Sequence, residues 1–547
     1  MATRDEPAPH SEYDVLVLGA GWSGLLACKY CTGAGLRTLV LEKRPTIGGV
    51  WAYTDETTCG GVMQNTVTTS SKCITEISDF PMPDEYGDFL HHTQIMAYLT
   101  AYAGRFALLP HIRFGQDVTH VAKRGQTWLV ATREGHTYSA RHLVVSTGVH
   151  QRPADVSGDA RFEGFAGALL HSAQVKRFTA DDAGKTVIVW GGGESASDVA
   201  HEASQVAERV YFCIPNGQWF LPKVVDRWPP FPSWGPKVVD HTSSRLRLFL
   251  SPTYRYSPFV AQYLSYTFGF NGHGQEAWRT HAPYNRSFFN KSQDVLADVR
   301  AGRVIPKQDI ARCDGRTVHF TDGTKTEADV IVTCSGYRIA FPFLDDRVAA
   351  GTDPRAWYKY VFCQGDPTLA FVGFARPIFG SIPGLAELQS RLVAAVFSGR
   401  VALPSAAERA RAIAHDRRFW SHHLRHTSLR IGGLVDHFKY SDQLASLLGC
   451  RPRLRSLLWR NPRRWWRAIT APWNGCQFWL DEPDHRNRVY ATFRRYHNNR
   501  ASEIWVFVVL APLLPLVMLY SYAREALRER FDPIYRASTH ESVAGDR

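Results

Sequence analysis

The sequence of 547 residues lacks the clustered cysteines and histidines that a metal site requires. Its ten cysteines are scattered, and the closest pair is Cys28 and Cys31. Because no second Cys-x-x-Cys or histidine pair could complete a zinc set, no metal site is expected. Residues 1–12 also lack the apolar run of a secretory signal peptide. The thiols are therefore predicted to be reduced and intracellular.

Charged residues are absent from Ile504 to Tyr522, a stretch of 19 positions. This is about the length that a helix needs to span a bilayer, although Pro512 and Pro515 would kink it. A helix lying in the membrane interface and a buried hairpin remain alternatives. The prediction is membrane attachment, with the rest of the chain facing the cytosol.

Acidic residues are missing from Arg451 to Arg467, which holds seven arginines and three tryptophans, and the chain has a formal net charge of +13. Such a basic segment can bind an anionic membrane or a nucleic acid. The apolar stretch that follows favours the membrane, and no nucleic-acid partner is expected. Hydrophobic residues at 44% and charged residues at 21% are typical of a globular chain, here of two or three domains.

The first unit that carries chemistry follows a short apolar strand, YDVLVL at residues 13–18. The motif G-x-G-x-x-G comes next, as Gly19-Ala20-Gly21-Trp22-Ser23-Gly24, and a helical pattern follows. Its glycines permit the turn, the approach of a pyrophosphate and close helix packing. A second strand then ends in Glu42, which is placed to bind ribose hydroxyls. The pattern predicts a dinucleotide site, and it places Cys28 and Cys31 on the packing side of the first helix.

A second unit repeats this arrangement. TVIVW at residues 186–190 leads into G-x-G-x-S-A, and RVYFC at residues 209–213 reads as the next strand. The residues expected to bind its nucleotide are Gly191, Gly193, Ser195, Ala196, Ser197 and Asp198. Two nucleotides in one chain indicate electron transfer from a nicotinamide cofactor to a flavin.

Two more strands end in glycine turns, RHLVVSTG at residues 141–148 and DVIVTCSGY at residues 329–337. We expect the second to return to the first sheet, with hinges near residues 165 and 330. The fold class is α/β, with two Rossmann-like dinucleotide-binding domains, the second inserted in the first, and a C-terminal hydrophobic anchor. The predicted divisions are 1–165 and 329–450 for the first dinucleotide-binding domain and 166–328 for the second, with an aromatic, partly helical insertion at about 215–300. A basic membrane-proximal region is expected at 451–503, the anchor at 504–522 and the tail at 523–547.

These motifs resemble those of the class B flavoprotein monooxygenases, and among them the flavin-containing monooxygenases of eukaryotes. The resemblance rests on the two glycine units, on Glu42, on GGVW at residues 48–51 and on DVIVTCSGYRIAFPFL. It covers nearly the whole chain. The family fingerprint F-x-G-x-x-x-H-x-x-x-(Y/F) is matched by Phe165, Gly167 and His171, whereas Val175 departs from it. The segment is predicted to link the two nucleotide domains.

The resemblance implies an FAD-dependent monooxygenase that uses NADPH and O2, with NADH as the alternative reductant. One oxygen atom would pass from a C4a-(hydro)peroxyflavin to a soft nucleophile, an amine nitrogen or a thioether sulfur. The FAD contacts would come from Gly19 to Gly24, Glu42, Val50, Trp51, Thr68, Thr69 and Ser70. It also implies an endoplasmic-reticulum membrane location, and a homo-oligomer is left open.

Two further departures bear on this mechanism. The family has an Asn in its NSSK-like segment near the flavin oxygen adduct, where this chain has Thr69. Its hydroxyl can donate one hydrogen bond, and Asn65 is the nearest amide that could compensate. The family also has an Arg after the strand RVYFC to clamp the 2′-phosphate of NADPH, where this chain has Ile214-Pro215-Asn216. Lys223 is an alternative cation for that phosphate.

Other functions stay open at this stage. A Baeyer–Villiger-type ketone monooxygenase shares every nucleotide motif, and an uncoupled NADPH oxidase is compatible with Thr69. A disulfide reductase is disfavoured, because its Cys-x-x-Cys would have to lie beside the flavin, whereas Cys28 and Cys31 lie on the helix near the ADP end.

Overall fold

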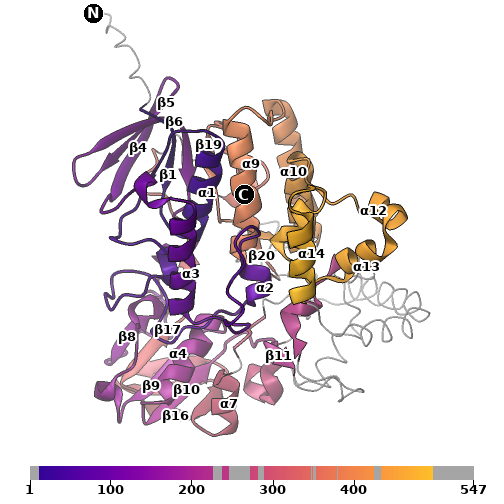
Figure 1. Cartoon of the computed structure of the whole chain (residues 1–547). Coiled ribbons are helices and arrows are strands. Elements are labelled where there is room, and N and C mark those ends of the chain that lie inside the picture. Colours follow the sequence, from indigo (N-terminus) through magenta and orange to yellow (C-terminus); the bar gives the residue numbers. More distant parts are fainter. Residues whose placement is uncertain are drawn as a thin grey trace, which may run out of the picture.

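The computed structural model describes residues 12–225, 237–245, 271–280, 289–292, 294–345, 348, 353–378, 380–423 and 433–496. They form two α/β units and a helical C-terminal region (Figure 1). The two units have separate sheets. Each sheet is built largely of parallel strands, as in nucleotide-binding α/β folds.

The first sheet has seven strands in the order β3-β2-β1-β6-β5-β4, with β19 also pairing with β6. Strands β1, β2, β3, β6 and β19 run parallel, while β5 and β4 form an antiparallel extension. The strands are β1 (Tyr13–Leu18), β2 (Thr38–Leu41), β3 (Ile112–Arg113), β4 (Val118–Arg124), β5 (Thr127–Thr132), β6 (Thr137–Val145) and β19 (Leu369–Phe371).

Helices α1 and α9 pack against each other beside this sheet (Figure 1). α1 begins directly after the first glycine turn, and the sheet side of this helix buries Leu25, Cys28 and Cys31 completely. Burial raises the pKa of the Cys28 thiol to about 12, as expected for a packing cysteine rather than a reactive one. The helices around the sheet are α1 (Trp22–Gly33), α2 (Lys72–Thr75), α3 (His92–Arg105), α9 (Ile382–Phe397), α10 (Ala406–His423) and α11 (His437–Leu447).

The second sheet is entirely parallel, in the order β13-β10-β9-β17-β8. Helix α4 follows β9 and packs with α7 on this sheet. The elements are β8 (Ala168–His171), β9 (Thr186–Trp190), α4 (Glu194–Ser204), β10 (Arg209–Cys213), α7 (Asp294–Arg300), β13 (Val304–Lys307) and β17 (Val330–Thr333). Between β13 and β17 the chain forms a separate three-stranded sheet of β14 (Ile310–Asp314), β15 (Thr317–Phe320) and β16 (Lys325–Glu327).

The prediction that the strand near residue 330 returns to the first sheet is wrong. β17 lies inside the second sheet, between β9 and β8, with Val332 opposite Val189 and Leu170. An apolar strand such as VIVT fits a parallel sheet that is buried on both faces, so its sequence did not distinguish the two sheets. The chain re-enters the first unit afterwards, where Leu344 bridges to Val121 and β19 pairs with β6.

The C-terminal region packs on the first unit through buried polar contacts. Tyr496 donates a hydrogen bond of 2.8 Å to Glu76, and the amide of Asn474 donates to the same carboxylate at 2.9 Å. Its helices are α12 (Leu454–Arg460), α13 (Pro462–Thr470) and α14 (Arg486–Arg495).

The predicted membrane segment, residues 504–522, lies outside the described residues. Within the part of the chain that the structure describes, no helix is both long and apolar enough to cross a bilayer. Much of the predicted aromatic insertion also lies outside it. Of the described part, Phe220 and Trp278 are buried against the second sheet.

Candidate functional site

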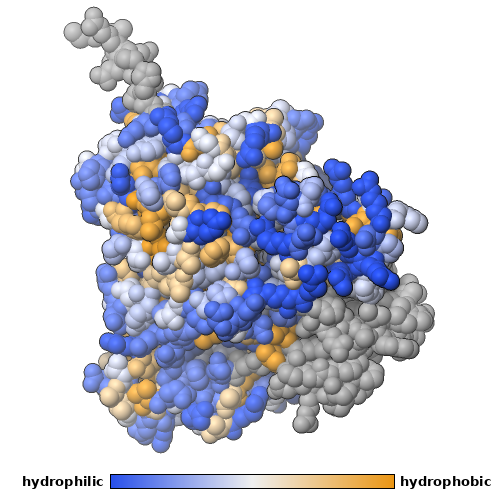
Figure 2. Space-filling view, in the orientation of Figure 1, coloured by the Kyte–Doolittle hydropathy of each residue, from blue (hydrophilic) through white to orange (hydrophobic). Residues whose placement is uncertain are grey.

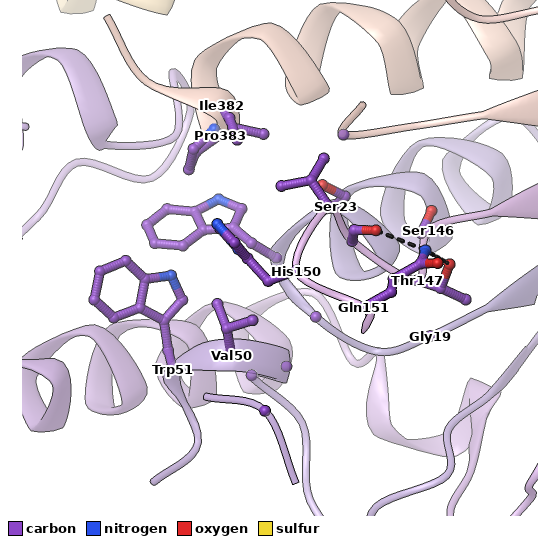
Figure 3. Close-up of a pocket in the computed structure, with 18 of the residues that line it drawn as sticks. Gly19, Ser23, Val50, Trp51, Ser146, Thr147, His150, Gln151, Ile382 and Pro383 are labelled. Atoms are coloured by element: carbon purple, nitrogen blue, oxygen red, sulfur yellow. Dashed lines mark hydrogen bonds between the residues drawn. The ribbon is translucent and has the colours of Figure 1, made fainter. Parts of the chain in front are cut away.

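A cavity of about 790 Å³ lies where the carboxyl ends of strands from both units meet. Ligands of open parallel sheets bind at this edge. The cavity is lined from the first unit by the predicted residues Gly19, Gly21, Trp22, Ser23, Glu42, Val50, Trp51, Thr68, Thr69 and Ser70, and from the second by Ser195 and Asp198. Figure 3 shows side chains from several separate segments facing this space. The cavity therefore brings together the two motifs that the sequence singled out.

The first glycine turn requires glycine at two positions. Gly19 has a φ of +98°, a conformation that other residues rarely adopt. At Gly24, a Cβ atom would lie 1.8 Å from the carbonyl oxygen of Gly19. Gly24 and Ala20 do not line the cavity themselves, since they hold the turn from behind.

The glycines of the two turns at the cavity floor face each other. A Cβ atom on Gly49 would lie 3.0 Å from the Cα atom of Gly21, so the two backbones are in contact and a side chain at Gly49 would push them apart. Arg44 holds the turn at Gly49 in place by donating to the carbonyl oxygens of Gly49 at 2.9 Å and Ala52 at 3.1 Å. Both glycines line the cavity, and a backbone surface without side chains beside a helix N-terminus suits the pyrophosphate of a dinucleotide.

Glu42 lies at the end of β2 with its carboxylate buried at the cavity wall. Its two oxygens accept hydrogen bonds from the backbone N–H of Ala20, at 2.6 Å, and of Arg44, at 2.8 Å. These bonds fix the carboxylate beside the glycine turn while leaving lone pairs for further donors. The position fits the predicted contact with the ribose of an adenine dinucleotide.

The first unit also lines the cavity with a second helix N-terminus that sequence reasoning missed. α9 begins beside Ser381, Ile382 and Pro383, and the Ser381 side chain caps the helix by accepting from Gly384 N–H. Figure 3 places Ile382 and Pro383 above Trp51. A Ser before a Pro and an apolar helical pattern is a helix-start signal, so the sequence did contain the clue.

His150 also lines the cavity and was not predicted. Figure 3 shows His150 and Trp51 at the same cavity. The His150 ring packs edge-on against Tyr337, with 5.1 Å between the ring centroids. His150 is exposed to the open cavity, and desolvation by the groups around its ring, with the nearby Arg376 guanidinium, lowers its pKa. The imidazole is therefore neutral at pH 7 and can accept one hydrogen bond and donate another.

The second glycine turn is covered by two amide side chains. Gln218 donates to the carbonyl oxygen of Gly192 at 2.7 Å, and Asn290 donates to Gly193 at 3.1 Å and to the Ser197 hydroxyl at 2.7 Å. Ser197 and Ala196 are fully buried, and neither they nor Gly191 and Gly193 line the cavity. Of the second motif, the cavity is reached by Ser195, by Asp198 and by Glu194, which sequence reasoning did not single out.

Thr69 connects the two units directly. Its hydroxyl donates a hydrogen bond of 3.0 Å to the carboxylate of Glu194, the first residue of α4. Burial raises the pKa of Glu194, and burial together with Glu194 raises that of Asp198 to about 7. The acidic groups at this end of α4 are thus held where their charged forms are disfavoured.

Asn65, the amide expected to lie nearest to Thr69, does not reach the cavity that Thr69 lines. Asn65 is exposed, is not among the residues lining the cavity, and hydrogen-bonds Glu202 two turns along α4. Asn65 lies in a turn, and Val67, between it and Thr69, forms an isolated β-bridge with His91, so the two side chains are held apart.

The fingerprint segment forms the edge strand β8 and the turn after it. His171 caps that turn by accepting from Ala173 N–H at 3.0 Å, and its other ring nitrogen lies 3.1 Å from the carbonyl oxygen of Gly336. Val175 is buried in the core of the second unit, and the next carbonyl, that of Lys176, accepts from Gln64 N–H in the first unit. These contacts place the segment between the two units.

The turn after β10 carries no cation, as the sequence Ile214-Pro215-Asn216 indicated. Lys223 lies elsewhere, with its ammonium 5.3 Å from the ring centroid of Phe89 and close enough to lower the pKa of Glu194 and Asp198. The positive charge of Lys223 therefore stabilises the charged carboxylates of Glu194 and Asp198, at the N-terminal end of α4. Among the described residues, no group of three or more His, Cys, Asp and Glu side chains could hold a metal ion.

Comparisons with known proteins agree with this geometry. A model of the flavin-binding monooxygenase-like family matches residues 12–497. Human flavin-containing monooxygenase 2 is 31% identical over 513 residues, which cover 88% of this chain and 92% of that protein. A 4-hydroxybenzoate brominase (decarboxylating) of Pseudoalteromonas luteoviolacea (strain 2ta16) is 29% identical over 491 residues, with the same two coverages.

Solved structures share the fold. The structure of S-allyl-L-cysteine S-oxygenase from Allium sativum has a TM-score of 0.59 at 20% identity and covers 88% of this chain and 99% of its own. An open structure of cyclohexanone monooxygenase has a TM-score of 0.61 at 16% identity, covering 81% and 98%. The match of the family model to residues 12–497 shows that this chain belongs to the flavin-binding monooxygenase-like family, whose members use FAD and NADPH.

Proposed function

We propose that this protein uses NADPH and O2 to transfer one oxygen atom to the nitrogen of an amine or the sulfur of a thioether. The observation that carries the proposal is the single cavity shared by the first glycine turn and the N-terminal end of α4. A flavin and its reductant must meet in one water-poor space for such a reaction. The relatives named as flavin-containing monooxygenase and S-oxygenase support N- or S-oxygenation.

The chain's own residues would divide the work. Gly19, Gly21 and Ser23 would hold the FAD pyrophosphate at the N-terminus of α1, and Glu42 its ribose. Val50 and Trp51 would exclude water near the ring system, and Ser195 would meet the nicotinamide nucleotide at α4. Bound FAD supplies the reaction with O2, and NADPH supplies the hydride.

We further propose that the second nucleotide-binding domain is inserted in the first. The strands of the first sheet come from residues before β8 and, with β19, from residues after β17. With β17 in the second sheet, the boundary moves from residue 329 to beyond Thr333.

The direct test is purification of the full chain, followed by measurement of bound FAD and of NADPH consumption with and without a tertiary amine or a thioether. We expect most of the NADPH consumed to appear as oxygenated product and the remainder as hydrogen peroxide, and slower turnover with NADH. Oxygenation of a cyclic ketone in place of both substrates would favour the Baeyer–Villiger alternative. Hydrogen peroxide in an amount equal to the NADPH consumed, with no product, would contradict the proposal.

Replacing Thr69 with asparagine is expected to reduce the hydrogen peroxide released per NADPH consumed by up to about fivefold, the equivalent of one hydrogen bond worth ~1 kcal/mol. Asparagine retains a donor for Glu194 and adds further hydrogen-bonding atoms to the cavity wall. The measurement compares peroxide with oxygenated product. Thr69→Ser, which keeps the hydroxyl, should behave as the original chain does, and an unchanged ratio in Thr69→Asn would show that this position does not govern coupling.

We also propose that the helical pair α12–α13 rests on an anionic membrane, on the cytosolic face and, as the resemblance implies, of the endoplasmic reticulum. All seven arginines between Arg451 and Arg467 are exposed, and Trp459 and Trp466 expose 85% and 39% of their surfaces. Figure 2 shows a strongly hydrophilic surface over these helices, at the right of the view. Arginines beside exposed tryptophans suit the headgroup region of a bilayer.

Exchange of Arg460 and Arg463 for glutamine should weaken binding of the full chain to vesicles that contain phosphatidylserine by about 30-fold, since each cation near such a surface contributes ~1 kcal/mol. Co-sedimentation with anionic and with zwitterionic vesicles measures the effect. The same exchange at Arg124 and Arg312, which lie on strands away from α12–α13, should leave binding unchanged. Equal losses in both double variants would contradict a specific role of the helical pair.

A further inference from the structure

Glu194 places a carboxyl group where an anion is expected to bind. It is the first residue of α4, directly after the second glycine turn, and it lines the shared cavity. The N-terminus of a helix favours negative ligands through its unpaired N–H groups and its dipole. Asp198, one turn further along, also lines the cavity. A pyrophosphate bound at this helix would therefore approach two carboxyl groups.

The charges that face Glu194 come from several segments. Thr69 donates a hydrogen bond of 3.0 Å to it from the first unit. Three cations act on its carboxylate and lower its pKa, Lys291, Lys223 and Arg376, whereas burial raises it by more. Lys291 is already shared, because its ammonium lies 2.8 Å from Asp240, whose other oxygen accepts from Ser71 N–H at 2.8 Å.

Asp198 has a more acidic neighbourhood. Glu194, Glu202 and Asp294 all raise its pKa, and Lys223 is the cation that lowers it. Burial is the largest cause, and the pKa reaches about 7. The charged forms of both carboxyl groups are thus disfavoured before any nucleotide arrives. A pyrophosphate adds negative charge nearby, which favours their protonated forms further.

We propose that Glu194 takes up a proton when NADP(H) binds, so that its neutral carboxyl group, held by Thr69, removes a charge that would repel the pyrophosphate. Glu194 is then a positioning residue that links occupation of the second unit to the Thr69 segment of the first. The inference rests on the proposed binding of the nicotinamide nucleotide at the N-terminus of α4. It assigns Glu194 rather than Asp198 because Glu194 lies in the first helical turn and bonds across the cavity.

The direction of the pH effect follows from proton linkage. If the complex binds one more proton than the free protein, the dissociation constant for NADP+ rises with pH, by at most about tenfold per pH unit. The rise is confined to the range between the pKa of Glu194 in the free protein and its higher pKa in the complex. Below that range the carboxyl group is neutral in both states, and affinity no longer depends on it.

The test uses the FAD-loaded full chain and NADP+ as the probe. Titration from pH 6 to 9 gives the dissociation constant, and calorimetry in two buffers of different ionisation enthalpy gives the protons taken up. We expect proton uptake in the original chain, and in Glu194→Gln a smaller uptake, a flatter pH profile and at least about fivefold tighter binding at the alkaline end. Glutamine keeps an oxygen that can accept from Thr69, so the contact between the units is retained.

Matched variants isolate the effect. Glu202→Gln removes a carboxylate from the same helix outside the cavity lining, and it should leave uptake unchanged. Thr69→Val removes the donor that stabilises the charged form of Glu194, and it should move the loss of affinity to higher pH. Equal proton uptake in Glu194→Gln and the original chain, or loss of uptake in Asp198→Asn alone, would overturn the inference. Failure of the original chain to bind NADP+ at any pH would instead contradict the proposed function.

Discussion

Replacement of Gly24 by alanine should yield a chain that binds no FAD and unfolds at a much lower temperature. The new Cβ atom would lie 1.8 Å from the carbonyl oxygen and 2.9 Å from the carbonyl carbon of Gly19. Both atoms belong to the backbone, so α1 and the glycine turn must separate. We expect a loss of at least ~3 kcal/mol in the free energy of unfolding, since extra methylenes in a well-packed core already cost about 1–3 kcal/mol and backbone atoms cannot move aside as side chains can. Flavin absorbance and thermal unfolding measure the two effects.

The same helix supplies the control. Gly33 ends α1, and a Cβ atom there would meet nothing within 4 Å. Gly33→Ala should therefore bind FAD normally and be unchanged or more stable by up to ~1 kcal/mol. Normal flavin content in Gly24→Ala would mean that the turn can open without losing its ligand, against the close packing in the structure.

Exchange of Glu42 for alanine should weaken FAD binding by about 10- to 150-fold. The carboxylate fixes the N–H groups of Ala20 and Arg44 beside the cavity and is the proposed partner of the ribose, and hydrogen bonds to a charged group contribute about 1.5–3 kcal/mol. The dissociation constant of FAD can be measured by adding FAD to the apoprotein and following flavin fluorescence.

Glu42→Gln refines this test. Its amide has one acceptor oxygen in place of two, so one of the two backbone donors loses its partner. We expect affinity between those of the original chain and Glu42→Ala. If all three chains bind FAD equally well, the ribose lies elsewhere and the role of Glu42 is limited to the turn.

The sequence predicted the glycine turns well, because their requirements are local. A strand, a turn that needs glycine and a helix follow one another within about twenty residues, and Gly19 and Gly24 show the expected constraints. Glu42 was predictable for the same reason, since its distance from the turn is set by one helix and one strand.

Contacts between distant segments could not be predicted in this way. Thr69 was singled out in the sequence and Glu194 was not, and nothing local indicated that they share a hydrogen bond across the cavity. β17 has the composition of a strand for either sheet, and its true neighbours, β8 and β9, are known only from the pairing. Asn65 illustrates the converse, because nearness to Thr69 in sequence did not bring it to the cavity.

The position of β17 has a consequence for the order of events during synthesis. β8, which carries His171, takes its place in the second sheet by pairing with β17, and the two strands are separated by about 160 residues of chain. As a chain leaves the ribosome from its N-terminus, β8 emerges long before its partner, and β6 likewise emerges long before β19. Each sheet therefore gains its last strand late in translation, and until then exposes an apolar strand edge that a chaperone could shield.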